Sequence, residues 1–227
     1  MIRVFVGSDV FQRAAGMERT LEHSIRSRTK REVEITFMTS GTKGWEVTRD
    51  GRNGTWAIGH DPGEAWSGRG WGTDFSAFRF AIPEICGFRG RAIYLDVDQI
   101  VLGDIGELHD LRTFGPWALR HVPLTDVSVI DCEAFDRSGW PRIEQMRRSG
   151  WGAGQYVDLL LRLRLVSGGV PPEWNTLDRE TLTPTTKLAH FTTVPTQPWR
   201  PYPKTHYLDG APDWKALWER EHKAAHT

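Results

Sequence analysis

Two acidic residues two positions apart, Asp96 and Asp98, follow the largely apolar residues 91–95 (RAIYL). Side chains at positions i and i+2 of a strand project from the same face, so at a strand end both carboxylates can turn oxygens toward one hard cation. Solvated turn carboxylates are also common after strands, but Asp is disfavoured within strands and here follows the apolar residues directly. The spacing therefore predicts a divalent-metal site on Asp96 and Asp98.

A metal site of this kind needs a sheet to position it, and strand-like and helical patterns alternate along the chain. Strands are expected at residues 2–7, 32–38, 91–95, 117–120 and 127–130. Helices are expected at residues 12–28, 75–82 (ended by Pro83), 156–165 and 214–223. The alternation predicts one α/β domain over residues 1–227, with a largely parallel sheet whose ligands gather beyond the carboxyl ends of the strands.

Residues 44–72 interrupt this alternation. They contain many glycines and few aliphatic residues, together with many Trp, Arg and Asp residues. Such a composition is not expected to build regular buried structure. We interpret the stretch as a functional loop or lid, and a disordered excursion is the alternative.

Composition excludes several classes of protein. Lys plus Arg and Asp plus Glu both total 29, so the chain offers no broad basic surface for a nucleic acid. No signal-like N-terminus and no long apolar run is present, which predicts a soluble protein without a transmembrane segment. Cys86 and Cys132 are too few and too far apart for a disulfide framework or a cysteine zinc site, and they are expected to be reduced thiols in a cytoplasm.

The chain contains 11 Trp, several of them beside Gly or Pro. Indole faces can stack on sugar rings, which would indicate a carbohydrate site. Alternatively the tryptophans close loops over the core, where a buried indole needs only one partner for its N–H.

The sequence around the acidic pair resembles glycosyltransferase family 8. Residues 75–83 (FSAFRFAIP) and 92–108 (AIYLDVDQIVLGDIGEL) are similar to the core of that family. Residues 172–175 (PEWN) resemble its Trp-Asn element, and residues 189–191 (AHF) with 197–199 (QPW) resemble its His-aromatic segment followed by Pro-Trp. The resemblance covers most of the chain outside the glycine-rich stretch.

The resemblance implies a Rossmann-like GT-A fold and a nucleotide-sugar donor, usually a UDP-sugar. It also implies a Mn²⁺ (or Mg²⁺) ion and transfer with retained anomeric configuration to a carbohydrate or other hydroxyl acceptor. By position, Asp96, Asp98 and His190 match the family's metal ligands. A divalent ion and basic groups can stabilise the charge that develops on a leaving diphosphate.

Three further residues match the family's donor and catalytic positions. Arg79 matches its donor-contacting arginine, and Asp9 matches its acidic residue on the uracil side. Gln155 matches the Gln of its Asp-Gln pair, so Gln155 and Arg79 are the catalytic candidates.

The chain departs from the family pattern at two positions. Gln197 stands where the family commonly has a Lys before Pro-Trp, and Arg200 or Lys204 are the basic residues nearby that could substitute. Gly154 stands in place of the acidic neighbour of Gln155.

Two other classes of protein remain as alternatives. A haloacid dehalogenase-type phosphohydrolase would use Asp96 and Asp98 as nucleophile and general acid beside Mg²⁺, but that motif usually begins its domain. A noncatalytic carbohydrate-binding homologue would agree with Gln197, Gly154 and the many tryptophans.

Overall fold

The computed structural model describes residues 1–9, 14–41, 44–49, 52–59, 75–149, 151–193, 197–199 and 212–227. Within these residues, an eight-stranded sheet has the order β4-β3-β2-β1-β5-β8-β7-β9. Its strands are β1 (Ile2–Ser8), β2 (Val33–Gly41), β3 (Gly44–Arg49), β4 (Arg52–Gly59), β5 (Arg91–Asp96), β7 (Trp117–Leu119), β8 (Val127–Asp131) and β9 (Val166–Ser167). A smaller sheet contains β10 (Thr176–Leu177), β11 (Leu188–His190) and β6 (Gln99–Val101).

The predicted α/β fold is confirmed, with parallel pairs at the centre of the large sheet and one more, between β7 and β9, at its edge. Strand β1 pairs in parallel with both β2 and β5. Strands β3 and β4 continue the sheet on one side, and β8 and β7 on the other, through antiparallel pairs. The carboxyl end of β5 therefore lies beside the carboxyl end of β1 and the amino end of β8.

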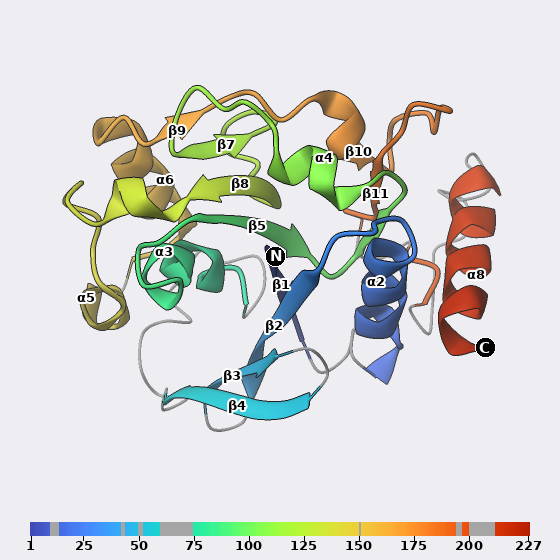
Figure 1. Cartoon of the computed structure of the whole chain (residues 1–227), viewed down its shortest axis with the longest axis horizontal. Coiled ribbons are helices and arrows are strands. Elements are labelled where there is room, and N and C mark those ends of the chain that lie inside the picture. The colour runs from blue at the N-terminus through green and yellow to red at the C-terminus, as the bar shows by residue number, and fades with distance from the viewer. Residues whose placement is uncertain are drawn as a thin grey trace.

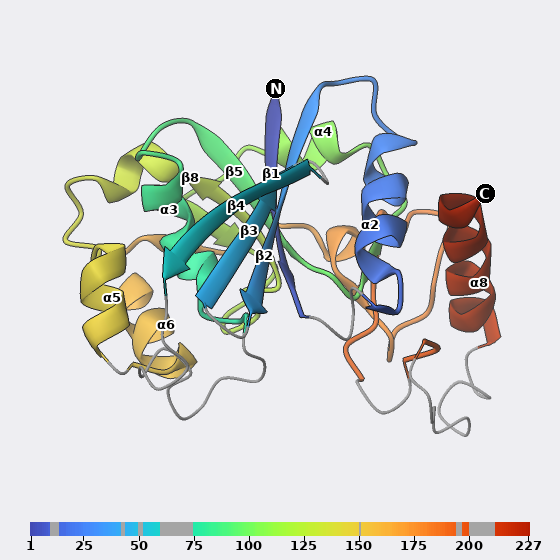
Figure 2. The same cartoon turned by 90° about the horizontal axis from the view of Figure 1, so that it is seen from below.

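Helical segments cover both faces of the sheet (Figure 1). The α-helices are α2 (Met17–Arg26), α3 (Ile82–Ile85), α4 (Ile105–His109), α5 (Ile143–Ser149), α6 (Ala153–Arg162) and α8 (Pro212–His226). Short 3-10 helices are η2 (Phe78–Ala81), η3 (Cys132–Phe135) and η4 (Pro172–Trp174). Helices α2 and α8 lie side by side at one end of the molecule, and α5 and α6 lie at the other (Figures 1 and 2).

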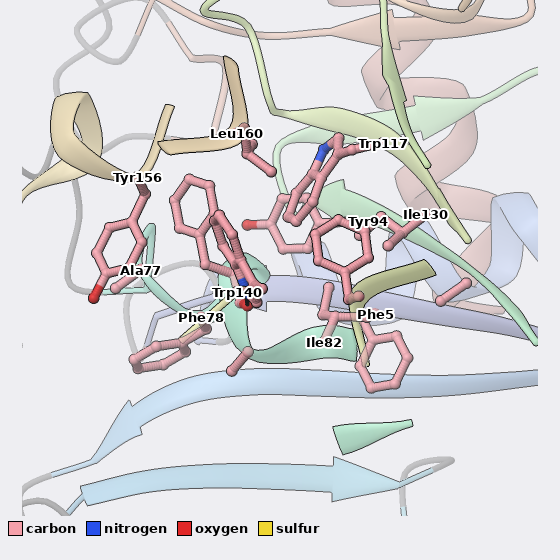
Figure 3. Close-up of a cluster of buried hydrophobic side chains, with 14 of the residues drawn as sticks. Phe5, Ala77, Phe78, Ile82, Tyr94, Trp117, Ile130, Trp140, Tyr156 and Leu160 are labelled. Atoms are coloured by element: carbon pink, nitrogen blue, oxygen red, sulfur yellow. Dashed lines mark hydrogen bonds between the residues drawn. The ribbon is translucent and has the colours of Figure 1, made fainter. Parts of the chain in front are cut away.

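The central strands carry apolar side chains on both faces. In β5, Ile93 and Leu95 pack into one buried cluster with Leu21 and Ile25 of α2. Tyr94, on the opposite face, packs into a second cluster that η2, α3 and α6 cover (Figure 3). A strand buried on both faces reads as a continuous apolar run, which is why residues 91–95 predicted a central strand.

The described tryptophans belong mainly to the core. Trp117, Trp140, Trp174 and Trp214 are at most 5% exposed. Figure 3 shows Trp117 and Trp140 together in the second cluster, where their ring centroids are 6.4 Å apart. The core interpretation is confirmed for these four residues.

The interpretation of residues 44–72 as a loop is wrong for residues 44–49 and 52–59. These residues form β3 and β4, which pair as an antiparallel hairpin, and β3 extends the sheet from β2. The hairpin has a signal in the sequence, because Asp50-Gly51 is a favoured turn dipeptide between runs that alternate in polarity. Residues 60–72 lie outside the described residues, so a lid role for this stretch stays a prediction.

Pro83 does not end the helical segment as predicted. Helix α3 begins at Ile82 and includes Pro83 in its first turn. The missing N–H of proline costs no intrahelical hydrogen bond at that position. Every helix in the described part of the chain is too short or too polar to cross a lipid bilayer.

Candidate active site

The acidic pair lies where β5 ends. Asp96 is the last residue of β5, and the chain turns through Val97 and Asp98 before β6 begins. The turn is fixed on both sides, because the Val97 N–H donates to Gly7 O at 3.0 Å and the Asp96 N–H donates to Asp126 O at 3.2 Å. Backbone bonds from neighbouring strands thus hold both carboxylates at the carboxyl edge of the parallel strands.

His190 reaches the same place from the small sheet. Strand β11 pairs antiparallel with β6, which sets His190 opposite Gln99. The next residue, Phe191, donates its N–H to Asp98 O at 2.9 Å. One possible ligand atom from each of Asp96, Asp98 and His190 lies within 4.8 Å of the others. We call these three residues the metal trio.

The trio has the chemistry of a divalent-metal site. His190 Nε2 lies 3.3 Å from Asp98 Oδ1. That carboxylate oxygen is buried and has no hydrogen-bond partner among the described residues. In the metal-free protein this oxygen has, within the part of the chain that the structure describes, only the ion pair with His190, and the same two atoms could instead bind one cation. Two carboxylates with one imidazole suit Mn²⁺ better than Ca²⁺, which prefers oxygen ligands alone.

Arg79 and Tyr94 hold the first ligand, Asp96. Arg79 Nη2 donates to Asp96 Oδ1 at 3.0 Å, and the Tyr94 hydroxyl donates to the same oxygen at 2.5 Å. The guanidinium also stacks over the Tyr94 ring, 4.3 Å from its centroid, and donates to Thr125 Oγ1. Burial raises the pKa of Asp96 to about 6, against the opposing charge of Arg79 and with added repulsion from Asp98.

Gly7 leaves the room that Tyr94 needs. A Cβ atom at Gly7 would lie 2.2 Å from the Tyr94 hydroxyl oxygen and 2.5 Å from the Phe75 ring. Gly7 pairs in register with Asp96 across β1 and β5. The absence of a side chain at this strand end therefore lets Tyr94 reach Asp96.

His190 is held from its other ring nitrogen. Nδ1 lies 2.9 Å from Asp126 Oδ2 and 3.0 Å from Asn175 Oδ1. Burial lowers the pKa of His190, but the negative charges of Asp98 and Asp126 outweigh it and raise that pKa well above its ordinary value. The reciprocal interaction holds the pKa of Asp126 below its ordinary value despite burial, mainly through the hydrogen bond from His190.

Asp126 is a site residue that the sequence did not reveal. It directly precedes β8, which runs antiparallel to β5 and pairs Val127 with Leu95. In a parallel sheet, a residue before a strand would lie at the opposite edge from the ligand site. The sequence does show an acidic residue beside a buried strand. That pattern places Asp126 at the site only when the direction of the strand is known.

Gln197 also contacts the trio. It is 1% exposed, and its Nε2 donates to Asp98 Oδ2 at 2.9 Å and to Phe191 O at 2.7 Å. At the position where the family commonly has Lys, this chain therefore has a neutral side chain that donates to Asp98, a predicted metal ligand. Arg200 and Lys204, the expected substitutes for the Lys, lie outside the described residues.

Asp9 and Gln155 lie outside the trio. Asp9 directly follows β1, at the edge of the sheet where Asp96 ends β5. Gln155 is on α6, in the part of the molecule opposite α2 and α8 (Figures 1 and 2). Its Oε1 accepts from the Gly152 N–H at 2.8 Å, so the side chain caps the start of that helix. A Cβ at the neighbouring Gly154 would meet nothing within 4 Å.

An open cavity of about 560 Å³ lies along α6. Its described lining residues are Trp151, Gln155, Asp158, Leu161 and Arg162. Gln155 therefore faces a space large enough for a small molecule, and none of the metal trio is among the described residues that line it.

The fold is similar to that of known glycosyltransferases. A galactosyltransferase, LgtC, in complex with donor and acceptor sugar analogs aligns with 97% of this chain and 100% of its own, with a TM-score of 0.61 and 13% identity. The glycosyltransferase GlyE of Streptococcus pneumoniae aligns with 98% of this chain and 61% of its own, with a TM-score of 0.60 and 14% identity. Mouse xyloside xylosyltransferase 1 aligns with 85% of this chain and 98% of its own, with a TM-score of 0.52 and 12% identity.

No protein-family model and no curated protein sequence matches the chain. The structural likenesses confirm the predicted GT-A glycosyltransferase fold.

Proposed function

We propose that this chain is a metal-dependent glycosyltransferase. It would move a sugar from a nucleotide diphosphate, specifically a UDP-sugar, to a carbohydrate or other hydroxyl acceptor with retained anomeric configuration. The observation that carries the proposal is the metal trio, in which Asp96, Asp98 and His190 converge at the carboxyl end of β5. Ligands of open α/β sheets bind at that edge, and the fold is one that known glycosyltransferases share.

Asp96, Asp98 and His190 would hold Mn²⁺ or Mg²⁺. When bound, such an ion supplies positive charge that stabilises a leaving diphosphate. The chain's own contribution is preorganisation, because Tyr94 and Gln197 each fix one oxygen of a different carboxylate. Ligands fixed in this way need not reorganise during the reaction.

Three other residues would act on the donor and acceptor. Arg79 is buried against Asp96 and would place its charge on the donor side of the trio. Asp9, beyond the end of β1, would contact the uracil. Gln155, facing the cavity along α6, would orient the reacting groups if the acceptor enters from that side.

The noncatalytic alternative loses one of its supports. It relied on Gln197, which brings no charge to the diphosphate. Gln197 instead donates to Asp98, so its neutrality is compatible with an intact metal site. We also propose that residues 1–227 form one GT-A-like domain and that the protein acts in the cytoplasm, where the thiols of Cys86 and Cys132 would remain reduced.

The direct test is release of UDP from a panel of UDP-sugars, with Mn²⁺ and with a chelator. We expect UDP release that requires the metal, with a broad set of sugars, or water, as the acceptor. Phosphatase activity on substrates without a nucleotide sugar would instead support the phosphohydrolase. UDP-sugar binding without release, in the presence of a broad set of sugar acceptors, would support the noncatalytic alternative.

A further inference from the structure

We propose that Asp126 is a positioning residue that orients His190 for metal binding, an inference that rests on the proposed metal site. The carboxylate of Asp126 and that of Asp98 lie at opposite nitrogens of the same imidazole. Asp126 Oδ2 is 2.9 Å from Nδ1, and Asp98 Oδ1 is 3.3 Å from Nε2. One carboxylate thus faces the proposed cation and the other lies behind the ring.

The contacts at Nδ1 determine which nitrogen can bind a cation. Both neighbours of Nδ1, Asp126 Oδ2 and Asn175 Oδ1, are hydrogen-bond acceptors. Nδ1 must therefore carry a proton and donate it. Nε2 is then the only ring nitrogen that can offer a lone pair to a metal, and it is the one that faces Asp98.

Asn175 completes the arrangement behind the ring. Its Nδ2 donates to Asp126 Oδ2 at 3.2 Å, and this bond fixes its carbonyl oxygen toward His190. Asn175 is fully buried, and Arg120 Nη1 donates to its backbone oxygen at 2.6 Å. The imidazole therefore has two fixed acceptors behind it and little freedom to turn.

The backbone of Asp126 ties this support to the acidic pair. Its carbonyl oxygen accepts from the Asp96 N–H at 3.2 Å and from Gln99 Nε2 at 3.1 Å. The residue that holds His190 is thus itself held by the end of β5 and the start of β6. Carboxylates that fix a metal-binding histidine in this way typically contribute about 10- to 100-fold in metal affinity.

A titration of Mn²⁺ in the presence of UDP, followed by the electron paramagnetic resonance of free Mn²⁺, tests this role. The variants are Asp126→Ala and Asp126→Asn, with Asp131→Ala as the matched control. Asp131 is at the far end of the same strand, and its carboxylate caps η3 by accepting from the Glu133 N–H. Thermal unfolding without metal shows which variants are folded, and Asp126→Asn serves as the test if Asp126→Ala is not.

We expect Asp126→Ala to raise the Kd for Mn²⁺ by about 10- to 100-fold. Asp126→Asn should lie between Asp126→Ala and the unmodified protein, because its amide oxygen can still accept from Nδ1, and Asp131→Ala should bind normally. Unchanged Mn²⁺ affinity in both folded Asp126 variants, or an equal loss in Asp131→Ala, would overturn the inference alone. If the unmodified protein binds no Mn²⁺ with UDP, the proposed function fails and this inference fails with it.

Discussion

Gln197 donates its side-chain N–H to Asp98 Oδ2 at 2.9 Å. Gln197 stands where the family commonly has Lys, whereas Asp98 matches one of the family's metal ligands. Because the same amide also donates to Phe191 O, Gln197 fixes both the carboxylate and the chain just after His190. A neutral donor positions Asp98 without competing with a cation for its charge.

The first prediction concerns Gln197→Lys, which restores the residue type of the family. A buried ammonium at this position would pair with Asp98 and neutralise part of the charge that attracts the metal. We expect weaker Mn²⁺ binding and slower UDP release, measured by titration and by a UDP assay. Gln145→Lys, which adds the same charge at an exposed position of α5, is the control. Faster UDP release with unchanged Mn²⁺ affinity would show that the site lacks a cation at position 197.

The second prediction concerns Tyr94→Phe. The change removes the hydroxyl that donates to Asp96 Oδ1 at 2.5 Å and leaves the buried ring in place. Hydrogen bonds to charged groups contribute about 1.5–3 kcal/mol, so we expect a loss of that order in the free energy of unfolding and weaker Mn²⁺ binding. Chemical denaturation and Mn²⁺ titration measure the two effects.

Tyr156→Phe is the matched control for Tyr94→Phe. The Tyr156 hydroxyl is buried in the same cluster but bonds to Ser149 Oγ, at 3.1 Å. It should lower stability without changing Mn²⁺ affinity. If both variants weakened Mn²⁺ binding equally, Tyr94 would have no specific role at Asp96.

Only part of this site could be predicted from the sequence. Asp96 and Asp98 are adjacent to an obvious buried strand, so local pattern was enough to find them. His190 has no such signal, because its proximity to Asp98 depends on the pairing of β11 with β6, and only the family resemblance indicated it. Asp126 was missed because β8 is antiparallel to β5, a direction that the alternation of strands and helices does not specify.

The strands of the large sheet could likewise be predicted only in part. The central strands were predicted because burial on both faces demands a continuous apolar run. The β3–β4 hairpin could not be predicted from glycine content, which favours a loop, and its signal is the alternation around Asp50-Gly51. Its strands lie toward one side of the sheet, where apolar content is a weaker guide.

The third prediction is that Mn²⁺ binding strengthens as pH rises. The pKa of Asp96 is raised to about 6, and that of His190 is well above its ordinary value, so metal-free protein holds protons that a cation must displace. Below the pKa of a ligand, affinity should fall by about tenfold per pH unit for each proton displaced. Calorimetry in buffers of different ionisation enthalpy should detect protons released at neutral pH. An affinity that stays constant between acidic and neutral pH would contradict this ligand set.

The most direct measurement of the central claim is the affinity for UDP with and without Mn²⁺, in the unmodified protein and in Asp98→Asn. The substitution keeps the size of the side chain and removes its charge. Calorimetry should show UDP binding that depends on Mn²⁺ in the unmodified protein, and no such dependence in a folded Asp98→Asn. If the variant still bound UDP in a Mn²⁺-dependent way, or if Mn²⁺ made no difference to either protein, Asp98 would not be a metal ligand and the proposed function would be contradicted.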